Sequence, residues 1–490
     1  MAKKVIVVGS GNAALCAGIA ALEKGADVLM LEKADTALAG GNTKYTAGAM
    51  RFAYNSGEEL LPLLQDQDDA RLPNTDFGSY TTETFATDLL GFNDGRPLSA
   101  EQQSLVHGSY EAVRWLASHN VKFEPIYSRQ SFEKEGRHVF WGGLTLAAHN
   151  EGVGLFDQEL DAFKRLGGEI RYNSAVTALL GEGTITGVRV GVEEITADAV
   201  ILASGGFEAD AKLRVKYMGA NWEKAKVRGT PHNTGDGIRM ALEVGAQKFG
   251  LFEGCHATPM DLHMADYGNL DLEPGERKNY RKICYFLGIM VNALGNRFVD
   301  EGINFRNYTY AQFGKAIMEQ PDHLAWQVFD SKVFELLYGE YTFQDAHFVE
   351  ADTLNELIDK MEGVDKVATR RTIDAFNEAV DQQSPFDPTV LDGKGTRGLD
   401  LEKSNWAQDI TQPPFRAYPV TGGITFTYGG LKVDENGAVL DENDHPIQGL
   451  YGCGELVGGV FFNGYPGGSG LTSGAVFGRR AGYGAASSDD

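Results

Sequence analysis

The sequence predicts an α/β protein in which a doubly wound, nucleotide-binding domain carries a second, inserted domain. Three observations lead to this prediction. Residues 4–33 alternate strand, helix and strand around a glycine-rich turn, further glycine-rich segments follow later apolar strands, and residues 354–383 have a helical period. A length of 490 residues also exceeds one ordinary hydrophobic core, so we expect two or three domains.

The N-terminal segment KKVIVVGSGNAALCAGIAALEKGADVLMLEK predicts a βαβ unit whose helix ends at Gly25. Its first turn contains the pattern Gly9-x-Gly11-x-x-Ala14. Here the first glycine permits a tight turn, the second admits a pyrophosphate, and the alanine lets the helix pack closely. Glu32 ends the second strand, where a carboxylate accepts hydrogen bonds from a ribose. The segment therefore predicts a Rossmann-like dinucleotide site.

Two later segments favour FAD, although the first turn alone leaves FAD and NAD open. The segment AGGNTKYTAGAM, residues 39–50, is glycine-rich with small hydroxyl and amide side chains suited to a second set of phosphate and ribityl contacts. The strand in ADAVILASGGFEAD, residues 197–210, ends on Ser204-Gly205-Gly206, as in two-part flavin domains. Three separated glycine clusters suit a long, extended cofactor.

The segment GGVFFNGYPGGSGLTSGAVFGRRAG, residues 458–482, surrounds Tyr465 with glycines. One interpretation is a glycine-rich surface loop. The other is a loop whose backbone lies against the isoalloxazine ring, since glycine is favoured where backbone approaches a partner closely. Tyr465 then faces the reaction, and the following helix directs its N-terminus at the flavin.

Composition excludes several classes of function. The net charge of −24 argues against nucleic acid and anionic membrane surfaces as partners. Four widely spaced cysteines without a CxxC pattern predict no metal site and no disulfide framework, and they fit a reducing compartment. We find no signal peptide and no apolar run of about 18 residues. We therefore expect a soluble, cytoplasmic protein.

These motifs together resemble the fumarate reductase/succinate dehydrogenase flavoprotein superfamily, over nearly the whole chain. Within it the sequence is most similar to tricarballylate dehydrogenase-type proteins, with 3-ketosteroid dehydrogenases as more distant relatives. The resemblance is carried by GSGNAAL, LEKA, GGNTKYTAGAMRFAY, ILASGGF, NTGDGIRMALEVGA, GNRFVDEGINFRNYTYAQFG, YPVTGGITFTYGGLKVD, GLYGCGELVGG and NGYPGGSGLTSGAVFGRRAG.

The resemblance implies a Rossmann-like FAD-binding domain of the glutathione-reductase type, with an inserted α+β capping domain. The FAD-binding domain is expected at 1–253 and 412–490, and the capping domain at 254–411. Residues 354–383 support the second domain, because they read as amphipathic helices rather than as part of a βαβ core.

The resemblance also implies the FAD contacts. Members in membrane complexes link flavin covalently to a histidine, and the matching position here is Asn42, so we expect non-covalent FAD. The expected contacts are Gly9, Gly11, Asn12, Ala13, Ala14, Glu32, Lys33, Gly40, Gly41, Asn42, Thr43, Ala47, Gly48, Val176, Ala203, Ser204, Gly205, Asp236, Gly454, Glu455, Gly470 and Leu471.

Arg306 matches the arginine that shuttles a proton in the family. Because arginine is almost always protonated, we expect a desolvated setting with carboxylate neighbours, and Asp300 and Glu301 are close in sequence. The alternative is a structural salt bridge. His256 matches a histidine that binds a substrate carboxylate, with a structural histidine as the alternative.

Two positions depart from fumarate reductases. Those enzymes carry a carboxylate-binding histidine near Thr425 and a substrate-binding arginine near Tyr465. The YPGG segment is instead similar to ketosteroid dehydrogenases, in which the tyrosine hydrogen-bonds a substrate carbonyl. A phenol can stabilise a developing enolate. The alternative is a tyrosine that only packs on the flavin edge. Further candidate contacts are Tyr308, Tyr310, Arg281 and Arg416.

The sequence thus predicts an FAD-dependent oxidoreductase acting on a CH–CH bond beside a carboxylate or carbonyl, with hydride passing to or from flavin N5. The expected substrate is a small polycarboxylate such as tricarballylate. The alternatives are a 3-ketosteroid dehydrogenase and a fumarate reductase-like enzyme. A third, of another class, is an electron-transfer flavoprotein subunit that docks to a partner. The electron acceptor is unknown, and a separate redox protein is one candidate.

Overall fold

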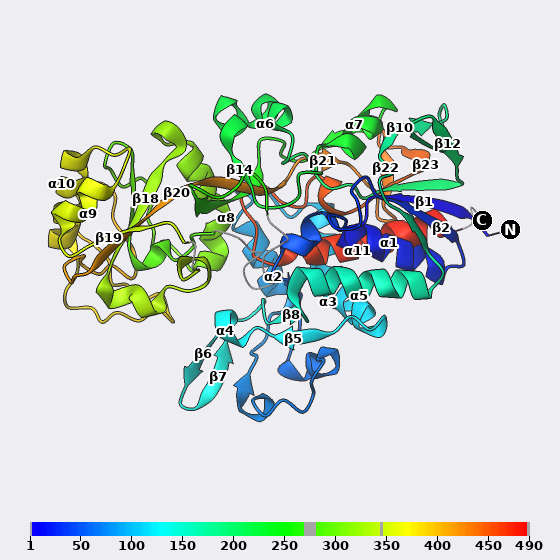
Figure 1. Ribbon diagram of the computed structural model, residues 1–490. Helices are drawn as coiled ribbons and strands as arrows, with labels where there is room; N and C mark the ends of the chain where they lie inside the picture. The colour runs from blue at the N-terminus through cyan, green and yellow to red at the C-terminus, as the bar shows by residue number, and fades with distance from the viewer. Residues whose placement is uncertain (1, 269–280, 344–345, 488–490) are drawn as a thin grey trace. The chain divides into compact units, whose positions relative to one another are not determined.

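The computed structural model describes residues 2–268, 281–343 and 346–487 (Figure 1). The chain divides into two compact units, the first made of residues 1–218, 229–255 and 426–490, and the second of 219–228 and 256–425. Residues 412–425, which the sequence places in the FAD-binding domain, belong to the second unit. The reason is that strand β20 (Phe415–Thr427) pairs there with β18 (Ala325–Asp330) and β19 (Val349–Ala351).

The first unit is built on a six-stranded sheet in the order β22–β23–β13–β1–β2–β9. All neighbours pair in parallel except β22 with β23. The strands are β1 (Lys4–Val8), β2 (Asp27–Leu31), β9 (Glu169–Arg171), β13 (Ala199–Leu202), β22 (Ala438–Leu440) and β23 (Pro446–Gly452). Because parallel strands end at the same edge, the turns after β1, β2 and β13 open together there.

Helices α1 (Asn12–Glu23) and α11 (Ser469–Ala486) lie side by side in the first unit (Figure 1). The contact face of α11 carries glycines at every fourth position, Gly474, Gly478 and Gly482. A Cβ at Gly478 would lie 2.5 Å from the carbonyl oxygen of Ala13, and one at Gly482 would lie 2.2 Å from that of Ala17. The missing side chains therefore allow the two helix backbones to approach each other closely.

Smaller elements complete the first unit. Its other helices are α2 (Thr82–Leu90), α3 (Ala100–Ser118), α4 (Tyr127–Gln130), α5 (Glu151–Arg165), α6 (Ala211–Met218) and α7 (Asp236–Glu243). Its other strands are β3 (Ala49–Met50), β4 (Thr75–Asp76), β5 (Phe123–Pro125), β6 (Ser131–Lys134), β7 (Arg137–Phe140), β8 (Leu146–Ala148), β10 (Val176–Leu180), β11 (Gly187–Val190), β12 (Glu193–Thr196), β15 (Lys248–Phe249) and β21 (Gly430–Leu431).

The second unit is built on a mixed sheet in the order β14–β20–β18–β17, with β16 and β19 also paired to β20. Its strands are β14 (Lys226–Val227), β16 (Cys255–Asp261), β17 (Ile289–Asn292), β18, β19 and β20, and its helices are α8 (Arg306–Met318), α9 (Leu354–Lys360) and α10 (Lys366–Ala379). Buried side chains of α9 and α10, among them Leu357, Ile373 and Phe376, pack in one core with β17 and β18. Residues 354–383 thus form the expected amphipathic helices.

None of the helices in the described ranges combines the length and the apolar character that crossing a bilayer requires.

Candidate active site

The turn after β1 has the geometry of a phosphate-binding turn. Gly9 has a φ of 112°, and a Cβ there would lie 2.3 Å from the carbonyl oxygen of Ala203, so only glycine fits. The main-chain N–H of Asn12 donates to Thr43 Oγ1 at 2.9 Å, and its side-chain amide donates to the carbonyl of Leu471 at 2.8 Å. Three expected cofactor segments, far apart in sequence, therefore meet at the N-terminus of α1.

Glu32 is fixed beside this turn. Its buried carboxylate accepts hydrogen bonds from the N–H of Ala34 at 2.7 Å and from the hydroxyl of Ser10. The Ser10 oxygen in turn accepts the N–H of Gly40 at 3.0 Å. The ribose-binding carboxylate expected from the sequence is thus held at the sheet edge by both neighbouring loops.

Lys33 and Asp236, both expected at the cofactor, pair with each other. Lys33 Nζ lies 2.7 Å from Asp236 Oδ2 and 2.7 Å from Thr234 Oγ1. Burial alone would raise the pKa of Asp236, but the hydrogen bond and charge of Lys33 outweigh it and lower that pKa. Asp236 is therefore an ionised, oriented side chain at the start of α7.

Several buried polar side chains from different segments meet at the turn after β13. Only some of them were expected from the sequence. Glu208 Oε1 accepts the side-chain amides of Asn42 and Asn233, each at 2.7 Å. Glu455 Oε1 accepts the N–H of Thr427 at 2.8 Å and its hydroxyl at 3.2 Å. Of these residues only Asn42 and Glu455 were expected. The signal for the others was weak: an acid directly after GGF, and the asparagine of NTGDG.

The described residues of the first unit fit FAD. Glycine stands where backbone must approach, a helix begins at the phosphate turn, and a carboxylate is positioned for a ribose. The Ser204 hydroxyl is buried and has no hydrogen-bond partner within the described part of the chain, as expected of a group that awaits a ligand.

The other expected cofactor residues lie along the same segments. Gly40 and Gly41 open the short 3₁₀ turn Gly41–Tyr45, and Val176 begins β10. A Cβ at Gly454 would lie 2.6 Å from Ala13 Cβ. The remaining positions of the set are Gly11, Ala14, Ala47, Gly48, Gly205 and Gly470, which all belong to the first unit.

Tyr465 belongs to an aromatic group at the N-terminus of α11, formed by Phe426, Tyr428, Phe461 and Tyr465. Its ring meets Phe426 edge-on at a centroid distance of 5.2 Å and Phe461 at 5.3 Å. A Cβ at Gly470 would lie 3.9 Å from the Tyr465 ring, in ordinary contact. Two edge contacts therefore fix this ring beside a glycine that we expect at the flavin.

The second unit gathers positive charge around His256. This histidine is completely buried on β16. Burial first, and then the guanidinium groups of Arg228 and Arg281, hold the pKa of His256 well below its ordinary value. Arg228 Nη1 donates to Thr425 Oγ1 at 3.4 Å, and Arg281 Nε pairs with Glu340 at 3.0 Å. His256 is therefore neutral and lies beside two cations.

Arg306 belongs to the same surroundings. Burial raises the pKa of the Cys284 thiol to about 12, and the charges of Arg306 and Arg281 both oppose that rise. The Arg306 guanidinium lies over the Tyr338 ring, 4.5 Å from its centroid. We call Arg228, His256, Arg281, Arg306 and Thr425 the cationic group.

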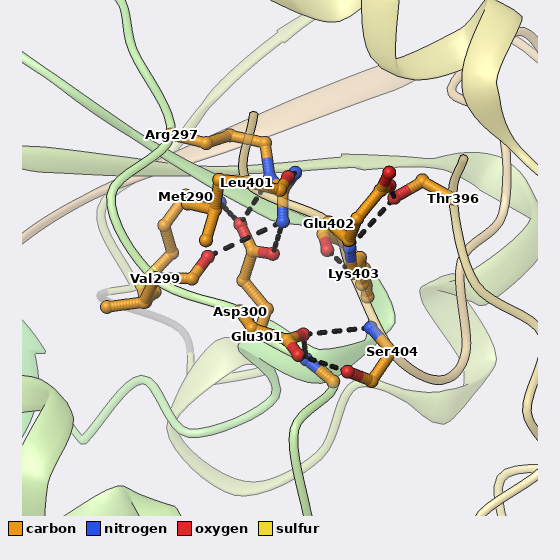
Figure 2. A network of polar contacts seen from close by, with 12 residues as sticks. Met290, Arg297, Val299, Asp300, Glu301, Thr396, Leu401, Glu402, Lys403 and Ser404 are labelled. Atoms are coloured by element: carbon orange, nitrogen blue, oxygen red, sulfur yellow. Dashed lines mark hydrogen bonds and ion pairs between the residues drawn. The ribbon is translucent and has the colours of Figure 1, made fainter. Parts of the chain in front are cut away.

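The expected carboxylate neighbours of Arg306 have other partners. Glu301 pairs with Arg297 at 2.6 Å and accepts the N–H of Met290 at 2.8 Å (Figure 2). Asp300 accepts the N–H of Ser404 at 3.0 Å and also its hydroxyl. Asp300 thus ties the loop before α8 to Ser404, whereas Glu301 binds Arg297 of the same loop and the backbone of β17.

A family model described as an FAD binding domain matches residues 4–471 of this chain. The fumarate reductase (cytochrome) of Shewanella frigidimarina is 30% identical over 491 residues, which cover 98% of this chain and 76% of that protein. The chain belongs to the fumarate reductase/succinate dehydrogenase flavoprotein superfamily. It is therefore an FAD-dependent oxidoreductase, and FAD is its cofactor.

Solved structures agree on the fold of this flavoprotein. A flavocytochrome c3 fumarate reductase in an open conformation superposes with a TM-score of 0.71 at 25% identity, covering 99% of this chain and 78% of that one. The 3-ketosteroid Δ1-dehydrogenase of Sterolibacterium denitrificans gives 0.72 at 22% identity and covers 99% of both chains. The second likeness concerns the fold alone.

Other relatives differ in length and in the activity that their names state. The 4-oxocyclohexanecarboxylate 2-dehydrogenase of Sinomonas cyclohexanicum is 26% identical, with 99% of this flavoprotein and 94% of that enzyme covered. The NADH:fumarate oxidoreductase of Klebsiella pneumoniae is 27% identical over 98% of this chain. This chain spans 47% of the Klebsiella protein, about half its length.

Proposed function

We propose that this flavoprotein oxidises or reduces a C–C bond beside a carboxylate, and that its substrate is a small polycarboxylate of the tricarballylate type. The cationic group carries the proposal. Arg228 and Arg281 lie beside one buried, neutral histidine, and Arg281 and Arg306 lie beside the buried Cys284 thiol, in a protein whose net charge is −24. Positive charge gathered in this way favours the binding of an anion. A small molecule with several carboxylates would meet several of these guanidinium groups at once.

Each member of the cationic group has a distinct role in the proposal, and so has Tyr465. Arg228 and Arg281 bind carboxylates through their planar forks of N–H donors. Neutral His256 adds one N–H donor without a pH-dependent charge, and Thr425 adds a hydroxyl. Arg306 transfers the proton, as the family resemblance implies. Tyr465 donates its phenol to the oxygen on which negative charge develops. When bound, FAD accepts or supplies the hydride.

A second candidate is a cyclic keto acid. Phe426 and Phe461 pack around Tyr465 and make its surroundings apolar, which suits a ring better than a linear polycarboxylate. The Sinomonas relative is named for a ring that carries both a ketone and a carboxylate. A substrate of this kind would employ the phenol of Tyr465 at the ketone.

Electrons must also enter or leave. We propose a separate redox protein or soluble carrier as the acceptor, because the four cysteines are widely spaced and form neither an iron–sulfur cluster pattern nor a CxxCH haem pattern. The alternative, that the chain is an electron-transfer subunit whose partner performs catalysis, predicts that purified protein will not react with any substrate.

Anaerobic mixing tests these alternatives. The FAD-loaded protein is mixed with tricarballylate, succinate, 4-oxocyclohexanecarboxylate or a 3-ketosteroid, and flavin absorbance is followed. The reduced protein is mixed with fumarate in the same way. We expect bleaching by tricarballylate. Bleaching by the cyclic keto acid alone would replace the first candidate with the second, and bleaching by the steroid alone would reject both.

Arg228→Ala tests the role of the cationic group. Removing this guanidinium should raise the apparent Kd of the polycarboxylate roughly 10- to 100-fold, since hydrogen bonds to charged groups contribute about 1.5–3 kcal/mol. Arg416→Ala is the matched control, because Arg416 lies on β20, pairs with Glu350 of β19 and is outside the group. Equal effects of the two variants would remove Arg228 from substrate binding.

A further inference from the structure

Two carboxyl groups lie together in the first unit. Glu208 follows the turn after β13 and is completely buried, whereas Glu455 lies in the 3₁₀ turn Gly454–Leu456 and is half-buried. The side-chain amide of Asn233 joins them, since its nitrogen lies 2.7 Å from Glu208 Oε1 and 3.5 Å from Glu455 Oε2. One amide donor therefore serves two carboxyls.

The hydrogen bonds around the pair leave one oxygen without a donor. Glu208 Oε1 receives the amides of Asn42 and Asn233, and Glu455 Oε1 receives the N–H and hydroxyl of Thr427. Glu208 Oε2 is buried and receives no donor from the described residues. A buried carboxylate oxygen without a donor is costly, and a proton held between the two carboxyls removes that cost.

The pKa shifts of the two carboxyls also indicate that they share a proton. Burial first, and then the neighbouring Glu208, raise the pKa of Glu455 well above its ordinary value. Burial also raises the pKa of Glu208, although its amide partners oppose the rise. Arg214 contacts this segment as well, but its guanidinium donates to the main-chain carbonyl of Glu208, at 2.5 Å. Two carboxyls in contact do not both ionise near neutral pH, so the pair carries one charge and one proton.

The pair adjoins the segments that we assign to FAD. A Cβ at Gly206 would lie 2.1 Å from Glu455 Oε1, so the glycine turn lies directly against the carboxyl. Asn42 donates to Glu208, and its own oxygen accepts the N–H of Thr230 at 3.0 Å. Because both ends of this amide are engaged, Glu208 fixes the orientation of a side chain that we expect beside the flavin.

We propose that Glu208 and Glu455 share one proton and hold a single fixed negative charge behind the FAD-binding segments, where the pair orients Asn42 and opposes reduction of the bound flavin. Glu208 is a positioning residue in this arrangement. The proposal goes beyond the proposed function, because it requires FAD but no particular substrate. Reduction adds two electrons to the flavin, and a fixed negative charge nearby disfavours them, so the pair lowers the reduction potential.

The test compares FAD-loaded wild type with Glu455→Gln and with the double variant Glu208→Gln/Glu455→Gln. The midpoint potential of the bound flavin is measured against pH without substrate, and infrared spectra record the C=O band of a protonated carboxylic acid. Glu159→Gln is the matched control, because Glu159 is another completely buried carboxyl of the first unit and contacts Cys16 instead.

Each variant has a distinct expected result. Glu455→Gln removes the shared proton but keeps the charge on Glu208, so one carboxylic acid band disappears. The double variant removes the charge, so the potential moves to more positive values. Glu159→Gln leaves the potential unchanged.

Two results would overturn the proposal. One is an infrared spectrum in which the C=O band of the carboxylic acid is the same in wild type and in Glu455→Gln. The other is a double variant that binds FAD with the wild-type potential. If the double variant does not fold, the infrared comparison of wild type with Glu455→Gln still tests whether the two carboxyls share a proton. Both readouts use the protein without substrate, so failure of the polycarboxylate assignment would leave them unaffected.

Discussion

Tyr465 is the position at which the resemblance leads us to expect an arginine in fumarate reductases. Its ring is held by edge contacts with Phe426 and Phe461, and a phenylalanine would keep both. Tyr465→Phe therefore removes only a hydrogen-bond donor. If that donor stabilises developing charge, the rate constant of flavin reduction by substrate should fall roughly 10²-fold, with FAD affinity unchanged.

Stopped-flow absorbance measures this rate. The control is Tyr483→Phe, because the Tyr483 hydroxyl bonds to Glu23 on α1, away from the aromatic group. A full rate in Tyr465→Phe would mean that the tyrosine only packs beside the flavin.

Some residues of the candidate site could be predicted from the sequence, and others could not. Gly9, Gly11 and Glu32 belong to one continuous segment, so their spacing encodes their geometry. Glu208 and Glu455 come from segments far apart in the chain, and no local pattern reveals that they touch. Asp300 is six residues before Arg306, yet its carboxylate accepts hydrogen bonds from Ser404, which is 104 residues further along the chain, so adjacency in sequence does not reveal such a partner.

At the scale of elements, the contact between α1 and α11 depends on glycine. Gly478→Ala would place a methyl group 2.5 Å from the carbonyl oxygen of Ala13, and a backbone atom cannot move aside as a side chain can. We expect a loss of about 1–3 kcal/mol in the free energy of unfolding, as for other overpacked sites.

Urea unfolding monitored by circular dichroism measures this loss. Arg479→Ala on the same helix is the control, since it introduces no new atom at the contact with α1. Equal stability of Gly478→Ala and wild type would show that the helices separate without penalty.

Helix α5 provides a pH-dependent contact with α1. Glu159 is completely buried, and its carboxyl meets the Cys16 thiol at 3.6 Å. Burial raises the pKa of Glu159 well above 4.5. The folded state thus binds this proton more tightly than the unfolded state. The resulting stability is fully present below about pH 4.5 and is lost as pH rises toward the folded-state pKa.

Glu159→Gln should abolish this dependence. The wild-type free energy of unfolding should carry an extra fall of about 1.4 kcal/mol per pH unit in that window, which the variant lacks. Urea titrations at several pH values, compared between the two proteins, measure the difference. Parallel pH profiles would mean that Glu159 is solvated in the native state.

Helices and strands could be predicted where the hydrophobic period and the flanking glycines indicate the same element, as in β1, α1 and α11. The short strands β3 to β8 were not predicted, because two- to four-residue segments have too few side chains to establish a period. Strand β20 was expected to lie largely in the first domain. Its thirteen residues pair mostly with strands of the second unit, and such long-range pairing leaves no local signature.

At the scale of the whole molecule, FAD is expected to act as part of the folded structure. Its expected contacts come from at least four segments of the first unit, so the unfolded chain cannot bind it. A free FAD concentration about 100 times the Kd should add about 2.7 kcal/mol to the free energy of unfolding. Thermal unfolding of protein stripped of FAD should therefore shift upward when FAD is returned.

FMN provides the control in this experiment. It lacks the adenosine half, for which Glu32 and the turn at Gly9 are arranged, so it should produce a much smaller shift. Equal shifts with FMN and FAD would contradict the assignment of these residues to the adenosine and pyrophosphate.

The pairing of α1 with α11 also determines when the first unit can finish folding. Asn12 and the carbonyl of Leu471, which it binds, are 459 residues apart. At about 5–20 residues per second, a ribosome needs roughly 25 to 90 seconds to make the chain between them. During that time the face of α1 that packs against α11 has no partner helix. The nascent chain must therefore depend on chaperones, or on the ribosome surface, for longer than a protein assembled from neighbouring segments would.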